Sequence, residues 1–303
     1  MSLVRTRRLV LAVATLSVIE GCGSSATPSP PPPTAPPRVY ASIQNPSGTV
    51  SIFSMPLTSA STAVSSFAGT SPTGMCVDAA HRLYIAGQAS GGSVSVFSQP
   101  IANGATPAFT LTSFGTNTVD CAIDAAGNLY VADILGAVRV FKAPITASST
   151  LDHSITASVT SPYGVAVDAA GDVFVSDSTT ITEYSPFASG NTLLHTFGSI
   201  FNNWGLAIGP DGDLYVANGT ANGEIDVYKP PFLNTSTPDH SLSIPGSPRV
   251  LYFAFDAATN MYVSGNTTSS WLWELVPPYT AAPMAAVTVN GATGTSGGVA
   301  VDQ

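Results

Sequence analysis

The sequence predicts an all-β fold, a six-bladed β-propeller with four antiparallel strands in each blade. Two markers that recur along the chain support this prediction. A turn residue recurs at Asp78, Asp124, Asp168, Gly209, Asp256 and Asp302, at spacings of 46, 44, 41, 47 and 46 residues. A proline recurs at positions 56, 100, 144, 186, 230 and 277, at spacings of 44, 44, 42, 44 and 47 residues. A period of about 45 residues with four strands per repeat is typical of propeller blades.

One repeat, residues 161–199, shows how the four strands are predicted. Residues 164–168 form a short apolar run, as expected of a strand that is buried on both faces. Residues 168–172 (DAAGD) form a turn, in which Gly171 supplies a positive φ. The second, third and fourth strands are predicted at 173–177, 181–184 and 192–197, and Pro186 ends the third.

The two ends of the chain share the last blade. Residues 39–42, 49–53 and 63–67 match the second, third and fourth strands of the repeat, but no first strand precedes them. Residues 297–302 match a first strand, so the C-terminus supplies the missing innermost strand. The five complete blades start near Pro72, Val119, Pro162, Trp204 and Leu251. Sharing a blade closes the ring and leaves no exposed sheet face between the first and last repeats.

The N-terminal segment is predicted to be a signal peptide, residues 1–21. Arg5, Arg7 and Arg8 precede an apolar run of 11 residues from Leu9 to Ile19, which is too short to span a bilayer. The following residues, VIEG before Cys22, resemble the lipobox of bacterial lipoproteins. The resemblance implies cleavage before Cys22 and acylation of Cys22. The alternative is an ordinary secretory signal that is cut nearby, with Cys22 playing no part.

Residues 22–37 are predicted to be a tether between the lipidated Cys22 and the folded domain, residues 38–303. The segment is rich in proline and serine, which favours an extended, semi-rigid spacer without a core. We therefore expect an exported protein, anchored to a membrane of a bacterial cell envelope by the lipid on Cys22.

The charge balance excludes some partners. The chain carries 9 basic and 18 acidic residues, a net charge of −9. Without residues 1–21 it retains 6 basic and 17 acidic residues, or −11. So few Lys and Arg residues disfavour binding to nucleic acid or to anionic lipid through the folded domain.

The repeat itself has a recognisable form, P-x-G-[apolar]-A-[apolar]-D-x-x-G-[DN]-[apolar]-[YF]-V-[AS]-[DN], seen most clearly from Pro162 to Asp177. It resembles the six-bladed propellers of the NHL-repeat and gluconolactonase-like type, over residues 38–303. The resemblance implies the architecture, but this fold hosts lactonases, lyases and pure binding modules. It also implies that ligands bind on the face where each innermost strand begins and each second strand ends. We call this the start face, and the opposite one the turn face.

Polar and aromatic residues that depart from the repeat on the start face are the candidates for ligand binding. Asp120 and Tyr252 replace glycines that begin the other innermost strands, and Tyr163 and Trp204 lie directly before such glycines. The full candidate set is Asp120, Asp133, Tyr163, Asp177, Trp204, Asn218 and Tyr252. Aromatic rings beside carboxylates and amides suit a polar ligand such as a sugar or a lactone.

Three hypotheses for function follow. The preferred one is a membrane-anchored lipoprotein without enzymatic activity or cofactor, whose propeller binds a small polar ligand or a protein partner. The alternative is a metal-dependent lactonase-type hydrolase, in which Asp120, Asp133, Asp177 and Asn218 would hold Ca²⁺. The gluconolactonase-like enzymes also use a Glu, but Glu183, Glu224 and Glu274 fall in or beside third strands. The third hypothesis is a scaffold without a small-molecule site.

Other polar residues are expected to be structural. His153, His195 and His240 fall in outermost strands and His81 in a turn, which disfavours a His-dependent enzyme. Asp78, Asp124, Asp168 and Asp256 are expected to accept hydrogen bonds from turn amides. Cys76 and Cys121 lie in innermost strands of adjacent blades. They form either a disulfide or two buried free thiols. We expect free thiols, because the innermost strands of adjacent blades are far apart for the geometry of a disulfide.

Overall fold

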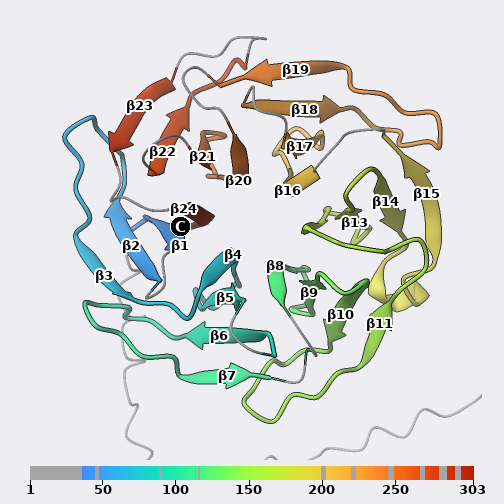
Figure 1. Ribbon diagram of the computed structural model, residues 1–303, viewed down its shortest axis with the longest axis horizontal. Helices are drawn as coiled ribbons and strands as arrows, with labels where there is room; N and C mark the ends of the chain where they lie inside the picture. The colour runs from blue at the N-terminus through green and yellow to red at the C-terminus, as the bar shows by residue number, and fades with distance from the viewer. Residues whose placement is uncertain are drawn as a thin grey trace, which may run out of the picture. The chain divides into compact units, whose positions relative to one another are not determined.

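The computed structural model describes residues 36–44, 48–88, 91–112, 114, 117–198, 203–219, 223–244, 249–266, 270–279, 285–290 and 295–303. These residues form six four-stranded antiparallel sheets, which surround a central axis as the blades of a propeller (Figure 1). The predicted fold class is therefore confirmed. The predicted signal peptide, Cys22 and most of the tether lie outside the described residues.

Five blades are continuous in the chain, and in each the strands run in sequence order from the axis outward. Blade 2 contains β4 (Pro72–Val77), β5 (Leu83–Gly87), β6 (Ser93–Phe97) and β7 (Phe109–Leu111). Blade 3 contains β8 (Thr118–Ile123), β9 (Leu129–Asp133), β10 (Ala137–Phe141) and β11 (His153–Ile155). Blade 4 contains β12 (Gly164–Val167), β13 (Val173–Ser176), β14 (Ile181–Tyr184), a short 3₁₀ turn η1 (Phe187–Ser189) and β15 (Leu193–Phe197).

Blade 5 contains β16 (Asn203–Ile208), β17 (Leu214–Asn218), β18 (Glu224–Tyr228) and β19 (His240–Ser243). Blade 6 contains β20 (Val250–Phe255), β21 (Met261–Asn266), β22 (Ser270–Leu275) and β23 (Ala285–Asn290). The innermost strands begin within two residues of the predicted positions. His153, His195 and His240 lie in the outermost strands of their blades, as expected.

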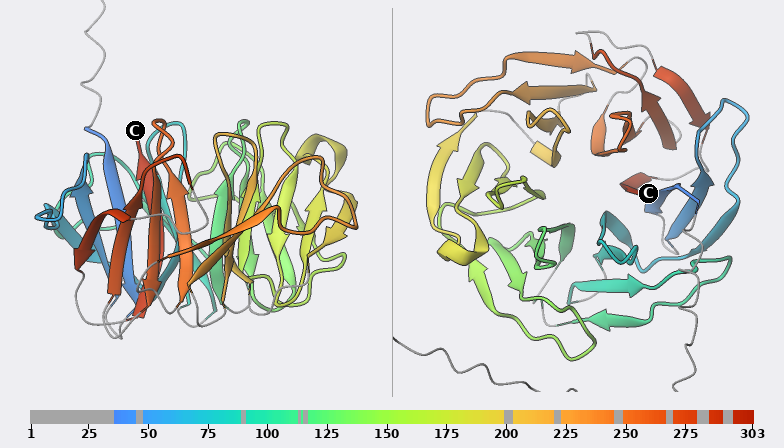
Figure 2. Two further views of the ribbon diagram at one scale, coloured as in Figure 1. Left: turned by 90° about the horizontal axis from the view of Figure 1, so that it is seen from above. Right: turned by 180° about the vertical axis from the view of Figure 1, so that it is seen from behind.

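The sixth sheet is the predicted shared blade, which we call the closing blade. It contains β1 (Arg38–Gln44), β2 (Thr49–Ser54) and β3 (Ser65–Ala68), and its innermost strand is β24 (Thr295–Asp302). β24 pairs antiparallel with β1, so that Arg38 lies opposite Asp302 and Val39 opposite Val301. The start of β1 and the C-terminus consequently lie on the same face of the ring, the turn face (Figure 2).

The core lies between neighbouring blades and repeats around the ring. Six tyrosines are among its largest fully buried side chains: Tyr40, Tyr84, Tyr130, Tyr184, Tyr228 and Tyr262. Several of them reach the turn aspartates. The hydroxyl of Tyr84 donates to Asp78 Oδ2 at 3.1 Å, and that of Tyr262 donates to Asp256 Oδ2 at 3.1 Å.

The turn aspartates have the structural role that the sequence predicts. In blade 4 the amides of Ala170 and Asp172 both donate to Asp168 Oδ1 at 2.9 Å. Asp78, Asp124 and Asp256 hold their turns in the same way. His81 has a φ of +59° at the position that Gly171 occupies in blade 4, and it too belongs to a turn.

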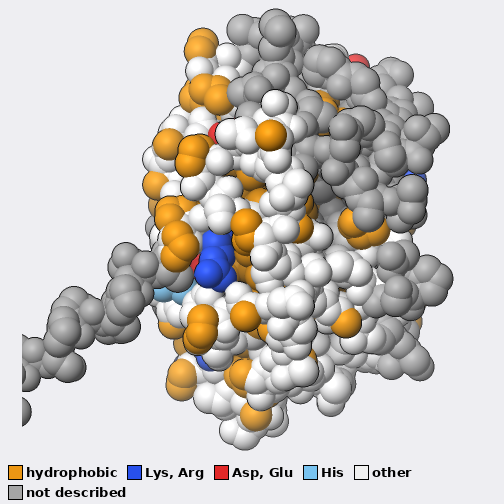
Figure 3. Space-filling model, turned by 90° about the vertical axis from the view of Figure 1, so that its left-hand side faces the viewer, with side chains coloured by type: hydrophobic (Ala, Val, Ile, Leu, Met, Phe, Trp, Pro, Cys, Tyr) orange, Lys and Arg blue, Asp and Glu red, His pale blue; other side chains and the backbone are white. Residues whose placement is uncertain are grey.

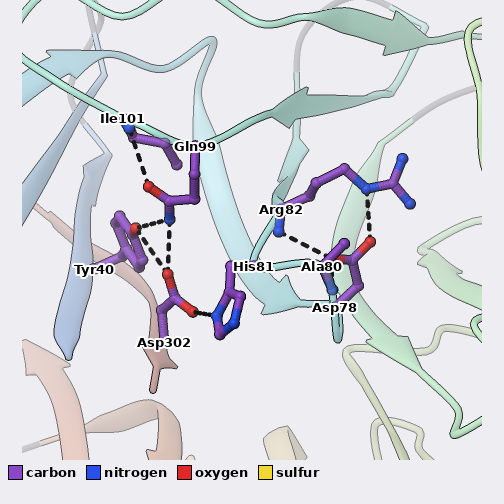
Figure 4. Close-up of polar contacts among 8 residues, drawn as sticks. All are labelled: Tyr40, Asp78, Ala80, His81, Arg82, Gln99, Ile101 and Asp302. Atoms are coloured by element: carbon purple, nitrogen blue, oxygen red, sulfur yellow. Dashed lines mark hydrogen bonds and ion pairs between the residues drawn. The ribbon is translucent and has the colours of Figure 1, made fainter. Parts of the chain in front are cut away.

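The closing blade is joined to blade 2 by a polar network around Asp302, the last turn aspartate (Figure 4). Its Oδ1 lies 2.6 Å from Nδ1 of His81, and its Oδ2 accepts a hydrogen bond of 2.7 Å from Gln99. Gln99 also donates to the Tyr40 hydroxyl at 3.0 Å. Asp302 is buried, so these contacts fix the end of β24 against the neighbouring blade.

The outside of the propeller carries few charges. In the side view of Figure 3 acidic and basic side chains are sparse, and hydrophobic side chains are scattered among uncharged ones. No helix in the described ranges is long and apolar enough to cross a membrane. This surface agrees with a composition that is only 9% charged.

Candidate functional site

The innermost strands converge at the start face because glycines begin most of them. A Cβ atom on Gly164 would lie 2.6 Å from the carbonyl oxygen of Trp204 in the next blade. A Cβ atom on Gly298 would lie 2.2 Å from the carbonyl oxygen of Thr73. Only glycine permits so close an approach of two backbones. The ring is therefore narrowest at this end, which is where Asp120 and Tyr252 depart from the repeat.

Asp120 is buried between three innermost strands. Its Oδ2 accepts a hydrogen bond of 3.1 Å from the amide of Val165 in β12. Its Oδ1 fills the space beside Gly74 of β4, where a Cβ atom would lie 2.0 Å away. Burial raises the pKa of Asp120 to about 8, although the amides of Val165 and Cys121 oppose the shift by donating to the carboxylate. At neutral pH the protonated form therefore prevails.

Tyr252 crosses the channel. Its hydroxyl donates a hydrogen bond of 3.0 Å to the carbonyl oxygen of Val119. Tyr252 belongs to β20 of blade 6 and Val119 to β8 of blade 3, and these two blades lie on opposite sides of the six-membered ring. Burial raises the pKa of Tyr252 well above its usual value, and the charges of Asp120 and Tyr163 add to the shift. The side chain thus closes the channel at the start face.

A cavity of about 280 Å³ lies along the axis below Asp120 and Tyr252. All six innermost strands line it; the lining side chains are almost entirely aliphatic or aromatic, but polar atoms make up most of the accessible surface. Residues near the turn end of the lining are partly exposed, namely Val77, Ile123, Val167, Ile208 and Phe255. Asp120 and Tyr252, at the other end, are each only 5% exposed. The cavity is consequently accessible from the turn face.

An aromatic cluster lies on the start face. The rings of Tyr163 and Trp204 are 5.2 Å apart, and the guanidinium of Arg249 lies 4.6 Å from the Trp204 ring. All three side chains are partly exposed. Among the described residues, neither Nε1 of Trp204 nor Nε of Arg249 has a hydrogen-bond partner, although both atoms are buried. Two of the predicted site residues are therefore brought together, with a guanidinium beside them.

The other three candidates, Asp133, Asn218 and Asp177, each interact with residues of their own blade. Asp133 is bound by Arg139, whose Nη2 lies 3.2 Å from its Oδ2. Asn218 donates to Asp226 Oδ2 at 3.0 Å. Asp177 accepts hydrogen bonds from the amide of Thr160 at 2.6 Å and from its hydroxyl at 2.7 Å. Although burial alone would raise the pKa of Asp177, these bonds and others from neighbouring amides lower it below its usual value.

These carboxylates do not fit the calcium site of the alternative hypothesis. Asp133, Asp177 and Asn218 each stabilise a loop or strand of their own blade, and none of them lines the cavity with Asp120. Within the described ranges, no three His, Cys, Asp or Glu side chains gather as they would to hold a metal ion. Among the described residues no calcium site is therefore assembled, and we derive no metal-dependent step from them.

Cys76 and Cys121 form a disulfide, so the expectation of two free thiols is wrong. Their Cα atoms are 5.8 Å apart, within the range that a disulfide spans. The reason is that the innermost strands β4 and β8 lie closer together than the sequence alone indicates. The bridge joins residues 45 positions apart, one repeat period, and it lies in the cavity wall.

Sequence reasoning named Tyr163, Trp204, Asp120 and Tyr252 because they break the repeat. It also noted that Arg249 lies near Tyr163 and Trp204, just before an innermost strand, but did not include Arg249 among the candidates. It also missed the network of Asp302, Gln99 and His81. That network involves side chains of two blades, which no single repeat reveals.

The sequence matches no protein-family model and no curated protein. The fold is similar to that of a protein of unknown function from Bacteroides caccae, with a TM-score of 0.68 and 11% identity over 89% of this chain and 100% of that one. It is also similar to a functionally unknown protein from Desulfotomaculum acetoxidans, with a TM-score of 0.61 and 16% identity over 87% and 85% of the two chains. Virginiamycin B lyase from Staphylococcus aureus matches with a TM-score of 0.50 and 12% identity, over 69% and 68%. At such low identity these likenesses show the propeller fold alone.

Proposed function

We propose that this protein is an exported bacterial lipoprotein, anchored through Cys22, whose propeller binds a polar ligand or a protein partner on the start face. The observation that carries the binding role is the cluster of Tyr163, Trp204 and Arg249. The two aromatic rings, tilted by 46° to each other, offer an apolar surface, and the guanidinium beside them offers hydrogen-bond donors.

The cluster is suited to a ligand such as a sugar or a lactone. In the described chain no acidic side chain pairs with Arg249, so its donors are available to an incoming acceptor. The buried Nε1 of Trp204 is a further donor without a partner. Unmatched donors of this kind cost free energy, and a ligand oxygen that accepted from them would relieve that cost. The metal-dependent lactonase remains the weaker alternative, since its ligands are not assembled.

A binding screen with a matched variant tests the site. The full-length protein in detergent is screened against glycans and small polar metabolites, and each hit is measured again with Trp204→Ala. We expect the affinity of a true ligand to fall about tenfold, because the stacking surface is lost. Phe187→Ala is the control, since Phe187 is a partly exposed aromatic residue on the outer part of blade 4. Ligands that bind equally well to the wild type and to Trp204→Ala would contradict the site.

Fractionation of cells tests the anchor. Cys22→Ser removes the thiol at the predicted cleavage site, which is the group that would carry the lipid. We expect the variant to move from the membrane fraction to the soluble exported fraction, while the wild type stays with membranes. Equal retention of both proteins in membranes would show that Cys22 does not anchor the chain.

A further inference from the structure

Arg249 differs from the other basic residues of the folded domain in where it lies and in what it contacts. Every charged residue of the domain, positions 38–303, falls within the described ranges. Three basic residues form ion pairs with aspartates: Arg82, Arg139 and Lys229. Two others, Arg38 and Lys142, lie at the turn face, where β1 begins and β10 ends. Of the described side chains on the start face, Arg249 is therefore the one Arg or Lys without an ion pair.

The carboxylates of the start face leave this charge uncompensated. Asp133 is paired with Arg139. Asp177 accepts hydrogen bonds from neighbouring amides and from a hydroxyl. Glu224 begins β18 on the same face, but within the described chain it forms no ion pair with Arg249. An anion that came to Arg249 would thus displace no carboxylate of the protein.

The ring of Trp204 holds the guanidinium of Arg249 in place. The guanidinium carbon lies 4.6 Å from the centre of this ring, and the ring of Tyr163 lies 5.2 Å beyond it. A cation is attracted to the face of an aromatic ring, but the contact neutralises no charge and uses no N–H group. Arg249 is partly exposed. Its charge and donors are consequently fixed beside two rings and remain available to a ligand.

This arrangement matches an anion of one charge on a ring-shaped body. A guanidinium binds an oxyanion through parallel N–H···O bonds. Arg249 supplies a single positive charge, which one carboxylate balances. A phosphate monoester carries a charge of about −2 at neutral pH, and its surplus would face a domain with 17 acidic and 6 basic residues. The aromatic rings favour a ligand that has a ring face to place against them.

We propose that the ligand of the start-face cluster, Tyr163, Trp204 and Arg249, is a small cyclic monocarboxylate. Its carboxylate binds the guanidinium, and its ring packs against the two aromatic side chains. The inference rests on the proposed function, that this cluster is a binding site, and adds the charge and shape of the ligand. Hexuronates and arenecarboxylates share this chemistry. Tyr252 closes the channel beneath, so the ligand stays on the start face.

Ligand-observed NMR titration of the full-length protein in detergent tests the charge with matched probes. Galacturonate is compared with galactose, and benzoate with benzyl alcohol; galactose 6-phosphate tests a dianion. We expect at least one carboxylate to bind about tenfold or more tightly than its neutral counterpart, and its affinity to fall as salt is added. The pair that shows this preference identifies the ring as a sugar or an arene. No binding of either carboxylate, equal affinity within both pairs, or tighter binding of the phosphate than of galacturonate would overturn the proposal.

Variants of equal net charge locate the contact. Arg249→Gln keeps a long polar side chain without the charge, and it should reduce the preference for the carboxylate to about onefold while the neutral probe binds as before. Arg249→Lys retains the charge but not the planar fork, so an intermediate preference is expected. Lys142→Gln is the control, because it removes an exposed, unpaired charge at the turn face. Melting temperatures show whether each variant is folded. A carboxylate preference that persists in Arg249→Gln would refute the contact.

The same variants separate this inference from the proposed function. A ligand from the glycan and metabolite screen that loses affinity with Trp204→Ala but not with Arg249→Gln would leave the binding role intact and refute the carboxylate. Ligands that are indifferent to Trp204→Ala would contradict the binding role itself. A ligand that is weakened by both variants, but not by Lys142→Gln, is the result that we expect.

Discussion

At the scale of single residues, a break in the repeat has a physical consequence that differs from position to position. Asp120 and Tyr252 both replace a glycine at the start of an innermost strand. Both side chains turn into the axis of the ring, where one is held by a backbone amide and the other reaches across to the opposite blade. Since these contacts lie inside the channel, the two residues close it rather than line an exposed mouth.

The raised pKa of Asp120 predicts how stability depends on pH. Its pKa is 3.8 in an unstructured chain and about 8 in the folded protein, so between these values the folded state retains a proton that the unfolded state has released. The free energy of unfolding therefore falls as pH rises through this window, by at most about 1.4 kcal/mol per pH unit from this group. Asp120→Asn should make urea denaturation midpoints between about pH 5 and 8 less dependent on pH.

The pH dependence of stability should differ between the wild type and Asp120→Asn in a definite direction. Wild type should lose more stability than Asp120→Asn on going to higher pH, because the amide of the variant does not titrate at this position. Parallel pH profiles would show that burial does not hold the proton on Asp120.

The sequence identifies the residues that break the repeat, but not the contacts that their side chains make. Asp120, Tyr163, Trp204 and Tyr252 are found because a repeat makes departures visible. Whether a side chain spans the channel depends on the distance between opposite blades. Glycines in several innermost strands, far apart in the sequence, jointly determine that distance. For the same reason the pairing of Cys76 with Cys121 could not be predicted, since the approach of β4 to β8 decides it.

At the scale of the elements, β24 holds the ring closed. It contributes the innermost strand of the closing blade, pairs with β1 and contacts blades 2 and 6 on its two sides. Its residues Val299 and Ala300 are buried in the interfaces with these neighbours. The prediction of this strand from residues 297–302 is confirmed because its sequence repeats that of the other innermost strands.

Deletion of residues 297–303 tests the closure. It would expose the apolar faces of two blades and leave the backbone groups of β1 unpaired. We expect an insoluble protein, or one whose melting temperature falls by roughly 10 °C or more. Deletion of the exposed Gln303 alone is the control, since it removes only the side chain that accepts from the amide of Ala257. A long truncation that melts like this control would contradict closure by β24.

At the scale of the whole molecule, the two faces of the propeller differ. The turn face carries the aspartates, the open end of the cavity and both described chain ends, whereas the start face carries the aromatic cluster. The repeat fixes this arrangement, because every blade runs in the same direction. The predicted tether joins the turn face through Arg38, so the start face should point away from an anchoring membrane.

Cysteine labelling tests the orientation. Asn203→Cys places a thiol at the beginning of β16 on the start face, and Ala170→Cys places one in an exposed turn of the opposite face. With a bulky thiol reagent on native membranes, Asn203→Cys should react readily and Ala170→Cys more slowly. A soluble form without the tether corrects for intrinsic reactivity. Specific protection of Asn203→Cys in the anchored protein would reverse the orientation.

The position of β24 also has a consequence for how the protein is made. The strand that completes the first blade is made long after β1, because Arg38 must wait for Asp302, some 264 residues later, before the two can pair. Until β24 has been synthesised, the closing blade lacks its innermost strand and the ring cannot close. Contacts of such long sequence separation make closure slow. A chain that ended before β24 would leave the ring open at the closing blade, so the ring reports whether both strands of this pair have been made.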